Sequence, residues 1–414
     1  MRRLAIVGLV VLAGCSGPST AKPSASPAAS ASPVAISTAC PPAGKAAAAV
    51  LTPVTLGNHP TIIYSDEPTA NGGPVVSSLV RYDVTTAAKA EILKTTVSEA
   101  EVSPDGHWIA LATLVSGQPA VQLVRTDGQY LQTVFCGEPN GSIRGILWSS
   151  DLKSLLFSAS SGSGPAPIYR LDLNKGTLDT ALRNNSLSTD YAPLSWVDAN
   201  RVLLLGRPIG PGPGYDLRVL DLSQGANQQA SDLPLVVSSS ADCWDADNDA
   251  TTVYTSACQG TFSDQGGGTM RGPTTISAQS ATGGQKRIVF NSPTLAVTQL
   301  RAVGSNQLLL SVGNQDPARS SAGSVNGLWK VNTDGSGLTR LAASAGKQGQ
   351  FAVYSQAAWA NVSRDGSLYA FQITSLGKPP SYSLVAGPMA GGQPTTIATR
   401  ADGGLLLMVG WTTS

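Results

Sequence analysis

Short apolar-rich segments alternate with turn-forming residues along most of the chain. Residues 101–113 are an example, because an S-P-D-G turn separates two segments in which apolar side chains dominate. Runs of four to eight such residues, bounded by Gly, Asn, Asp or Ser, predict β-strands joined by tight turns. The 414 residues include 44 glycines and 27 prolines, and only 13% are charged. This composition also favours an all-β domain with a large core.

The pattern recurs at a regular spacing. A Ser-x-Asp-Gly turn and a following strand occur at 103–106 and at 363–366, and weaker copies lie at 148–158, 196–206, 244–254 and 303–311. A second strand ending in an acidic or amide residue follows each copy, and then a shorter final strand. Each unit therefore holds four strands in roughly fifty residues, which is typical of a β-propeller blade.

Six complete units begin near residues 97, 143, 191, 239, 298 and 355. Ahead of them, residues 61–67, 79–83 and 90–93 supply three strands, and residues 404–412 have the pattern of a first strand. These four segments predict a seventh blade that joins the two ends of the domain and hides the edges of an open sheet. We therefore predict a seven-bladed β-propeller over residues 56–414, with four-stranded blades and a ring closed by the C-terminal strand.

Tryptophan recurs near the first turn of several units. Trp148, Trp196 and Trp244 are spaced 48 residues apart, and Trp359 and Trp411 stand at the corresponding point of later units. Recurrence at one position of each blade favours packing between blades over a stacking platform for sugars.

The S-P-D-G turn, the tryptophan ahead of it in most copies and the later I-Y-x-x-D strand at 168–172 resemble the WD40-like repeat of TolB-type propellers. The same repeat occurs in the propeller part of prolyl-oligopeptidase relatives. The resemblance covers nearly all of the chain after residue 55 and is sharp at 103–106 and 363–366. It implies protein partners and the propeller fold.

Asp105 and His107 lie two residues apart in the first of these turns. An acid–base pair would need a third partner, and other copies of the turn carry serine, lysine or arginine where His107 stands. We therefore expect Asp105 to cap the turn, Gly106 to adopt a positive φ, and His107 to begin the next strand.

The N-terminus has the features of a secretory signal. Arg2 and Arg3 precede an apolar run that is too short to span a bilayer. The L-A-G-C sequence that ends at Cys15 resembles the bacterial lipobox, which implies a signal peptide at 1–14, a lipid such as palmitate on Cys15, and a place on the extracytoplasmic side of the cell membrane. An ordinary signal peptide with a chance cysteine is the alternative. Residues 15–55 begin with an Ala/Ser/Pro-rich stretch that cannot bury apolar surface, and we expect a flexible tether.

The remaining cysteines are Cys40, Cys136, Cys243 and Cys258. An even number in an exported chain suggests disulfide bonds. Cys243 and Cys258 fall at the open end of one predicted hairpin, so we favour that pair, and Cys40–Cys136 would then fasten the N-terminal segment to the domain. A metal site at the cysteines is less expected because they form no CxxC pair. Calcium binding in the acidic run at 242–249 is less expected than a solvated turn, and we predict no metal and no cofactor.

Several kinds of function lack their sequence signals. The net charge of +1, which becomes −1 when Arg2 and Arg3 are removed with the signal, comes without a basic block, so nucleic-acid binding is not expected. There is no G-x-S-x-G, H-E-x-x-H or Walker motif. Peptidase relatives carry a separate hydrolase domain after the propeller, and the chain leaves no room for one after the closing strand. We expect no peptidase activity.

Loop length points to a binding surface. The connection between the second and third strands is long and rich in Gly and Pro in most units, whereas we expect the first and third hairpins to be short. In a propeller the long connections share one face with the links between blades, around the mouth of the central channel, and such loops commonly carry function. Neutral insertions in solvent are the alternative. Polar residues at the starts of inner strands are our candidate binding residues: Glu99, Arg144, Tyr191, Asp242 and Arg301.

These features predict a monomeric, lipid-anchored, non-enzymatic propeller on the extracytoplasmic side of the membrane. It would bind a protein, peptide or glycan of the envelope through its long-loop face. The alternative is a propeller enzyme of the glycan hydrolase or lyase type, with acidic residues at the channel mouth. A sensor or assembly platform for a secreted complex is a third, weaker hypothesis.

Overall fold

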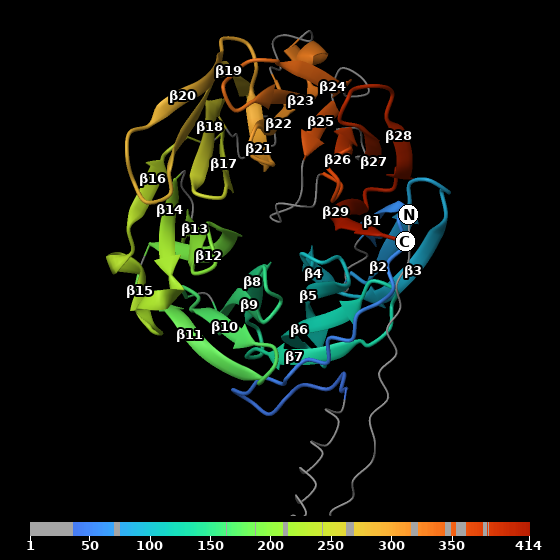
Figure 1. The fold of residues 1–414 in the computed structure, drawn as a ribbon, viewed down its shortest axis with the longest axis vertical. Coiled ribbons are helices and arrows are strands. Elements are labelled where there is room, and N and C mark those ends of the chain that lie inside the picture. The colour runs from blue at the N-terminus through green and yellow to red at the C-terminus, as the bar shows by residue number, and fades with distance from the viewer. Residues whose placement is uncertain are drawn as a thin grey trace, which may run out of the picture. The chain divides into compact units, whose positions relative to one another are not determined.

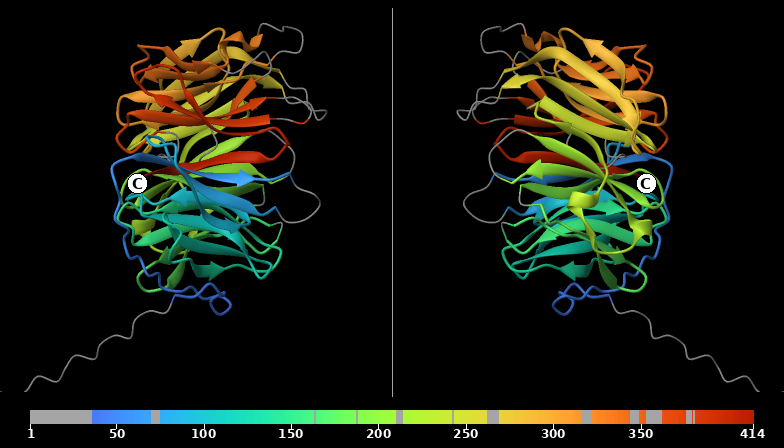
Figure 2. Two further views of the ribbon diagram at one scale, coloured as in Figure 1. Left: turned by 90° about the vertical axis from the view of Figure 1, so that its right-hand side faces the viewer. Right: turned by 90° about the vertical axis from the view of Figure 1, so that its left-hand side faces the viewer.

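Seven antiparallel sheets form a closed ring around a central opening (Figure 1). The computed structural model describes residues 36–69, 75–162, 164–186, 188–209, 214–241, 243–261, 269–315, 322–343, 349–352, 362–375, 379 and 381–414. The predicted signal peptide, Cys15 and the first part of the tether lie outside these residues. The side views in Figure 2 show the sheets stacked around the ring with the C-terminus at one face. The predicted seven-bladed propeller is confirmed.

Each blade runs from an innermost strand at the central opening to an outermost strand at the rim. From the inside outward, the closing blade contains β29 (Leu405–Thr413), β1 (Pro60–Glu67), β2 (Ser77–Asp83) and β3 (Lys89–Thr95). The next contains β4 (Val97–Val102), β5 (Trp108–Val115), β6 (Gln118–Arg125) and β7 (Gln132–Cys136). It is followed by β8 (Ser142–Trp148), β9 (Ser154–Ser160), β10 (Ile168–Asp172) and β11 (Thr177–Arg183), with β15 (Gln228–Gln229) added at the outer edge.

The other four blades have the same order. They contain β12 (Thr189–Trp196), β13 (Arg201–Pro208), β14 (Tyr215–Asp221) and β16 (Leu235–Ser239), then β17 (Cys243–Asp249), β18 (Thr252–Thr261), β19 (Thr269–Ser280) and β20 (Arg287–Ser292). The last two contain β21 (Val297–Val303), β22 (Gln307–Val312), β23 (Gly327–Asn332) and β24 (Thr339–Ala343), then β25 (Gly349–Ala352), β26 (Leu368–Ser375), β27 (Ser381–Pro388) and β28 (Thr395–Arg400). The described helices are three short 3₁₀ turns: η1 (Leu222–Gln224), η2 (Ala230–Asp232) and η3 (Ala322–Val325).

The two ends of the domain meet in one sheet. β29 pairs antiparallel with β1, so that Trp411 lies opposite Ile62 and Leu405 lies opposite Glu67. The amide of His59 and the carbonyl of Ser414 form a further hydrogen bond of 3.0 Å beyond the strands. Three strands from the front of the domain and one from the back therefore complete the ring, as the sequence predicted.

Every blade has the same irregularity between its third and fourth strands. The register shifts once in each of these seven pairs, for example at Ile168/Tyr169 between β10 and β11. A bulge adds one residue to one strand and increases the local twist. The outermost strand of each blade is therefore turned relative to the three strands inside it.

The core lies between adjacent blades. One cluster joins Trp108 and Leu123 of one blade to Trp148 and Phe157 of the next, and all four side chains are buried. Similar clusters fill the other interfaces that the structure describes. Removing apolar surface from water is the main favourable contribution, at about 25 cal/mol per Å². Both faces of each sheet are thereby covered.

Residues 36–58 pack along the outside of two blades, although we expected a tether as far as residue 55. The amide of Thr133 in β7 donates to the carbonyl of Ser37 over 2.8 Å, and the Cys40–Cys136 disulfide closes the same edge. Further along, the amide of Ala49 donates to the carbonyl of Leu173 over 2.7 Å in the neighbouring blade. This segment therefore covers an edge of β7 that would otherwise have unpaired backbone groups.

The turn at 103–106 is structural, as predicted. The Asp105 carboxylate accepts hydrogen bonds from the Ser103 hydroxyl and, over 3.1 Å, from the His107 amide, and Gly106 has φ +80°. The His107 ring accepts a hydrogen bond of 3.2 Å from the Val54 amide. The histidine therefore fixes the N-terminal segment to the ring, and β5 begins one residue later, at Trp108.

Candidate binding sites

The innermost strand of each blade is an edge strand, and in β8 a bulge leaves additional amides unpaired. The register shifts between Arg144 and Leu147, and Gly145 has φ +63°. Glu99 of β4, in the preceding blade, accepts hydrogen bonds from the amides of Gly145 (2.8 Å) and Ile146 (2.9 Å) with its two carboxylate oxygens. An acidic side chain of one blade therefore satisfies the free backbone donors of the next.

Glu101, two residues further along β4, repeats this contact. Its carboxylate accepts from the Trp148 amide over 3.1 Å, and its backbone carbonyl accepts from the Trp148 indole over 3.2 Å. Burial raises the pKa of Glu99 to about 7, although the two amides and nearby arginines oppose that rise. Burial also raises the pKa of Glu101, and the adjacent Glu99 adds to the effect. We call Glu99 and Glu101 the first latch.

A second pair with the same spacing lies on β17. Asp245 accepts from the Leu300 amide over 2.8 Å, and Asp247 accepts from the Ala302 amide over 2.8 Å, both in β21 of the next blade. The Arg301 guanidinium is buried and lies 2.8 Å from the Asp245 carboxylate. Burial raises the pKa of Asp247 to about 6 against the opposing effect of Arg301. We call Asp245, Asp247 and Arg301 the second latch.

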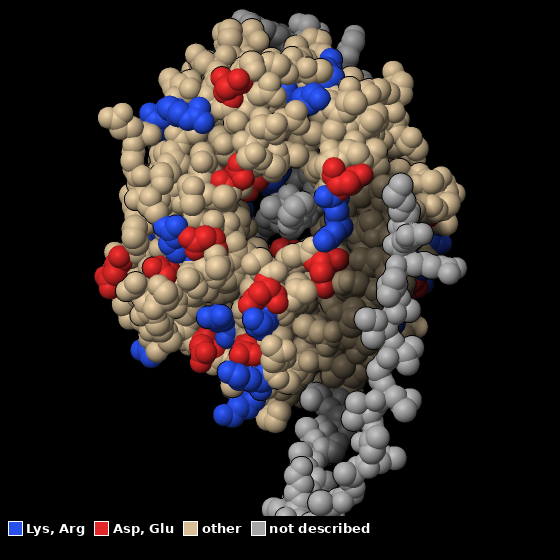
Figure 3. All heavy atoms as spheres, in the orientation of Figure 1, with Lys and Arg blue, Asp and Glu red and all other residues tan. Residues whose placement is uncertain are grey.

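These contacts give the candidate acids a structural role. Charged side chains surround the central opening when the ring is viewed along its axis (Figure 3). The four latch carboxylates, however, each accept at least one backbone amide of the neighbouring blade. Our sequence reasoning selected Glu99 and Arg301 but missed Glu101, Asp245 and Asp247. The sequence did contain a signal for these residues, because two acids separated by one residue occur in both β4 and β17.

The structure separates the other candidate binding residues. Arg144 is exposed and pairs with Asp190 over 3.4 Å. Asp242 lies outside the described residues. We expected Tyr191 at the channel mouth, but its side chain is buried, and its hydroxyl accepts from the Arg218 guanidinium over 2.9 Å and contacts Asp216 at 3.3 Å. Apolar burial of the ring explains this placement, and the four described candidates do not form one site.

Trp359 lies outside the described residues, and the other four tryptophans of the predicted set pack between blades, with one correction of register. The Trp196 indole donates to the Trp148 carbonyl over 2.6 Å, continuing the link from Trp148 to β4. In the next blade, Asn248 makes the equivalent bond to the Trp196 carbonyl over 2.9 Å. Trp244 stands four residues earlier than this position and stacks on Tyr215, with ring centroids 5.1 Å apart. The assignment of Trp244 to the repeated tryptophan position is therefore wrong.

A cleft of about 500 Å³ opens on the long-loop face, at the blade of β12–β16. It lies where β13 ends, β14 begins and β16 leads to the next blade. Its lining is rich in hydroxyl groups and consists of Ser188, Thr189, Gly206, Pro208, Gly214, Tyr215, Asp216, Ser238, Ser239 and Ser240. Parts of the predicted long loops, including 70–74, 210–213, 262–268 and 316–321, lie outside the described residues.

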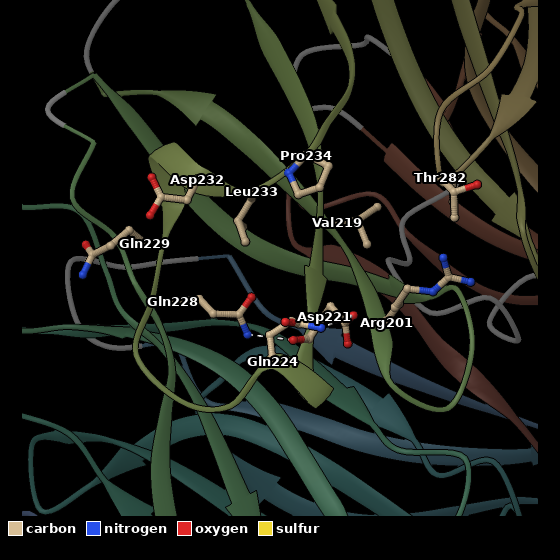
Figure 4. A pocket seen from close by; sticks show the side chains of 11 residues that line it. Arg201, Val219, Asp221, Gln224, Gln228, Gln229, Asp232, Leu233, Pro234 and Thr282 are labelled. Carbon is tan, nitrogen blue, oxygen red and sulfur yellow. Dashed lines mark hydrogen bonds between the residues drawn. The ribbon is translucent and has the colours of Figure 1, made fainter.

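A pocket of about 450 Å³ lies on the opposite face, which we call the hairpin face because the first and third turns of the blades are there. We expected all third hairpins to be short, but residues 222–234 form a long one between β14 and β16. Figure 4 shows its side chains around the pocket. The lining consists of Arg201, Val219, Asp221, Gln224, Gln228, Gln229, Asp232, Leu233, Pro234, Ala281 and Thr282.

Both predicted cysteine pairs are disulfides in the structure. Cys40 and Cys136 have Cα atoms 5.6 Å apart, and Cys243 and Cys258 have Cα atoms 5.1 Å apart at the open end of the β17–β18 hairpin. Among the described residues, no three His, Cys, Asp or Glu side chains are grouped to hold a metal ion. The same residues include no helix of the length and apolarity needed to cross a bilayer.

No protein-family model and no curated protein sequence matches the chain. Solved structures do. The propeller domain of the Trilobed protease from Pyrococcus furiosus is 11% identical, with a TM-score of 0.51, over 85% of this chain and 98% of that one. That propeller has an open velcro topology, whereas β29 and β1 pair in this chain.

An oligogalacturonate lyase from Vibrio parahaemolyticus is 11% identical, with a TM-score of 0.52, over 80% of this chain and 92% of that one. TolB from Acinetobacter baumannii is 13% identical, with a TM-score of 0.45, over 85% of this chain and 82% of that one. At these identities the similarity concerns the fold alone. The class is thus a seven-bladed β-propeller, with TolB-like and enzyme-like neighbours.

Proposed function

We propose that the protein is a lipid-anchored, extracytoplasmic and non-enzymatic propeller that binds a protein, peptide or glycan of the envelope through its long-loop face. One observation carries the proposal: the latch acids on the inner strands hold neighbouring blades together through backbone amides. Chemistry at the channel would have to break these contacts. The hydroxyl-rich cleft on the long-loop face provides a surface where a partner is recognised without such a cost.

Two further features support an envelope location. The signal-like segment 1–14 with Cys15 supplies a membrane anchor in this proposal, and two disulfides suit an oxidising compartment. The Cys40–Cys136 disulfide joins the end of the tether to β7. A pull on the anchor would therefore be transmitted to the ring itself.

A propeller enzyme of the glycan hydrolase or lyase type is the second candidate. The raised pKa of Glu99, about 7, is the observation in its favour, because general acids are commonly tuned in this way. Both carboxylate oxygens of Glu99, however, already accept backbone amides of the next blade, which is the arrangement of a structural contact. Turnover of a glycan that is lost in Glu99→Gln would favour the enzyme over the binding module.

Cross-linking in intact cells, followed by purification of the full chain, tests the proposal. Ser188→Trp and Ser240→Trp place a bulky ring in the cleft at exposed positions, and Ser305→Trp is a matched control on the hairpin face. We expect the first two variants to lose at least ten-fold of the captured partner and the control to retain it. Equal capture by all three would contradict the long-loop face as the binding surface.

The anchor is tested in the same cells with Cys15→Ser. We expect this variant to leave the membrane fraction and to lose labelling by a palmitate analogue. A chain that stays in the membrane without the label would overturn the lipid anchor and leave the cleft result unaffected.

A further inference from the structure

The hairpin-face pocket depends on a segment that the other blades do not have. Thirteen residues, 222–234, connect β14 to β16, whereas four to six residues make the corresponding turn in each of the other blades. β15 within this segment pairs in parallel with β11 of the preceding blade, and the Asn227 amide donates to the Thr180 carbonyl over 2.7 Å. The segment is thus fastened to a second blade and forms a fixed wall.

The pocket has an apolar floor and a polar rim. Val219, Leu233 and Ala281 are buried beneath it. Gln228 donates through its side-chain amide to the carbonyls of Asp221 (2.7 Å) and Gly225 (3.0 Å), which fixes its orientation. In Figure 4 the glutamines and Asp232 stand around Leu233 and Val219 rather than covering them. A small ligand would therefore meet apolar atoms below and amide or carboxylate groups at its edges.

The charges at the rim select against anions. Hydrogen bonds from Ser223 lower the pKa of Asp221, so this carboxylate is ionised at neutral pH. Asp232 adds a second, exposed acid. Arg201 is paired with Asp198 over 2.6 Å, so its positive charge is already compensated. A phosphate or carboxylate ligand would face net negative charge, which is unfavourable.

We propose that this pocket binds one neutral sugar residue of a glycan. A sugar ring has an apolar C–H face that suits Val219 and Leu233, and its hydroxyl groups both donate and accept hydrogen bonds. Glutamine amides can do both, and carboxylates accept, so the rim matches a hydroxylated edge. The site lies on the face opposite the long-loop cleft, and the inference goes beyond the function proposed above and does not depend on it.

The test uses the purified full chain and defined disaccharides. Cellobiose, maltose and chitobiose are the neutral probes, and digalacturonate and a lysine-containing tripeptide are the charged ones, with binding followed by saturation-transfer NMR and calorimetry. We expect at least one neutral disaccharide to bind. Its affinity should fall at least ten-fold in Gln229→Ala and in Asp232→Ala.

Gln393→Ala is the matched control, because Gln393 is an exposed glutamine in the corresponding turn of another blade. This variant should bind as the wild type does. Thermal unfolding of all three variants checks that the fold is intact. Absence of binding by every neutral disaccharide would overturn the proposal, and so would binding only of the charged probes or an affinity unchanged in both pocket variants.

Discussion

The two latches perform the same task with different charge balance. In each, two carboxylates spaced two residues apart on an innermost strand accept backbone amides from the next blade. In the second latch the buried Arg301 lies against the carboxylates, whereas the first latch has Glu99 and Glu101 beside each other, and Arg144 nearby is exposed. The comparison teaches that backbone amides hold carboxyl groups in both latches, and that burial raises the pKa of Glu99 to about 7 and that of Asp247 to about 6 even though Arg301 opposes the second rise.

The largest effect is expected from removing the cation of the second latch. Arg301→Ala leaves the buried Asp247 and the partly buried Asp245 without their counter-charge, which should lower the free energy of unfolding by about 3–5 kcal/mol. Denaturant unfolding at pH 7 measures this. Arg144→Ala breaks an exposed ion pair and should cost at most about 1 kcal/mol. Similar losses in both variants would mean that Arg301 contributes no more than a surface arginine.

A smaller effect on the free energy of unfolding is expected from a change of pH, and it should come mainly from the carboxyl groups of the first latch. The pKa of Glu99 is about 7 in the folded chain, above its ordinary value, so the folded state retains a proton that the unfolded state releases. Glu99 should therefore make stability fall by about 2 kcal/mol as pH rises from about 5 to 8, and Glu101, whose pKa burial also raises, adds to the fall. Asp247, with a pKa of about 6, adds to the fall at the lower end of this range.

Denaturant midpoints measured from pH 5 to pH 8 test this expectation. Glu99→Gln should be less stable than the wild type, because an amide cannot accept from both Gly145 and Ile146, but its stability should vary less with pH. Glu91→Gln, at an exposed carboxylate, is the control and should keep the wild-type slope. A wild-type profile that is flat or rises with pH would contradict the assignment.

The smallest expected effect on stability distinguishes Glu101 of the first latch from Asp247 of the second. Glu101→Gln keeps an acceptor for the Trp148 amide and removes a carboxyl that lowers stability at pH 7 because burial raises its pKa. The variant should therefore leave the free energy of unfolding at pH 7 unchanged or higher. Asp247→Asn removes a charge that faces Arg301 and should cost about 1–2 kcal/mol. Paired thermal melts at pH 7 compare the two. Equal melting temperatures would show that Arg301 does not distinguish the latches.

Much of the fold could be predicted because its signals are local. The Ser-x-Asp-Gly turns, the spacing of the units and the extra strand at 404–412 each follow from chemistry within a few residues. The disulfides could also be predicted from the sequence, because Cys243 and Cys258 lie opposite each other in one hairpin. The 48-residue spacing of the tryptophans put Trp244 at the repeated position, but the position is defined by the hydrogen bond to the tryptophan carbonyl of the preceding blade, which comes from another residue. Asn248 occupies the position that faces Trp196.

The candidate sites were less predictable for a physical reason. Backbone amides donate the hydrogen bonds that Glu99 and Asp245 accept. Because every residue except proline carries such an amide, no residue type in the sequence identifies these donors. Tyr191 reads as a polar residue at the start of a strand, yet its ring is buried. The pocket required residues 222–234 to pair with β11, a contact between blades that no local pattern indicates.

The amino-acid sequence by itself determined the strands, their turns, the repeat and the meeting of the two ends, since these depend on neighbours along the chain and on alternating burial. The tertiary structure alone decided which charged groups are buried together and where cavities remain. Those outcomes depend on how adjacent blades are rotated and spaced. Differences of a few ångströms between blades determine whether an acid contacts an amide, an arginine or water.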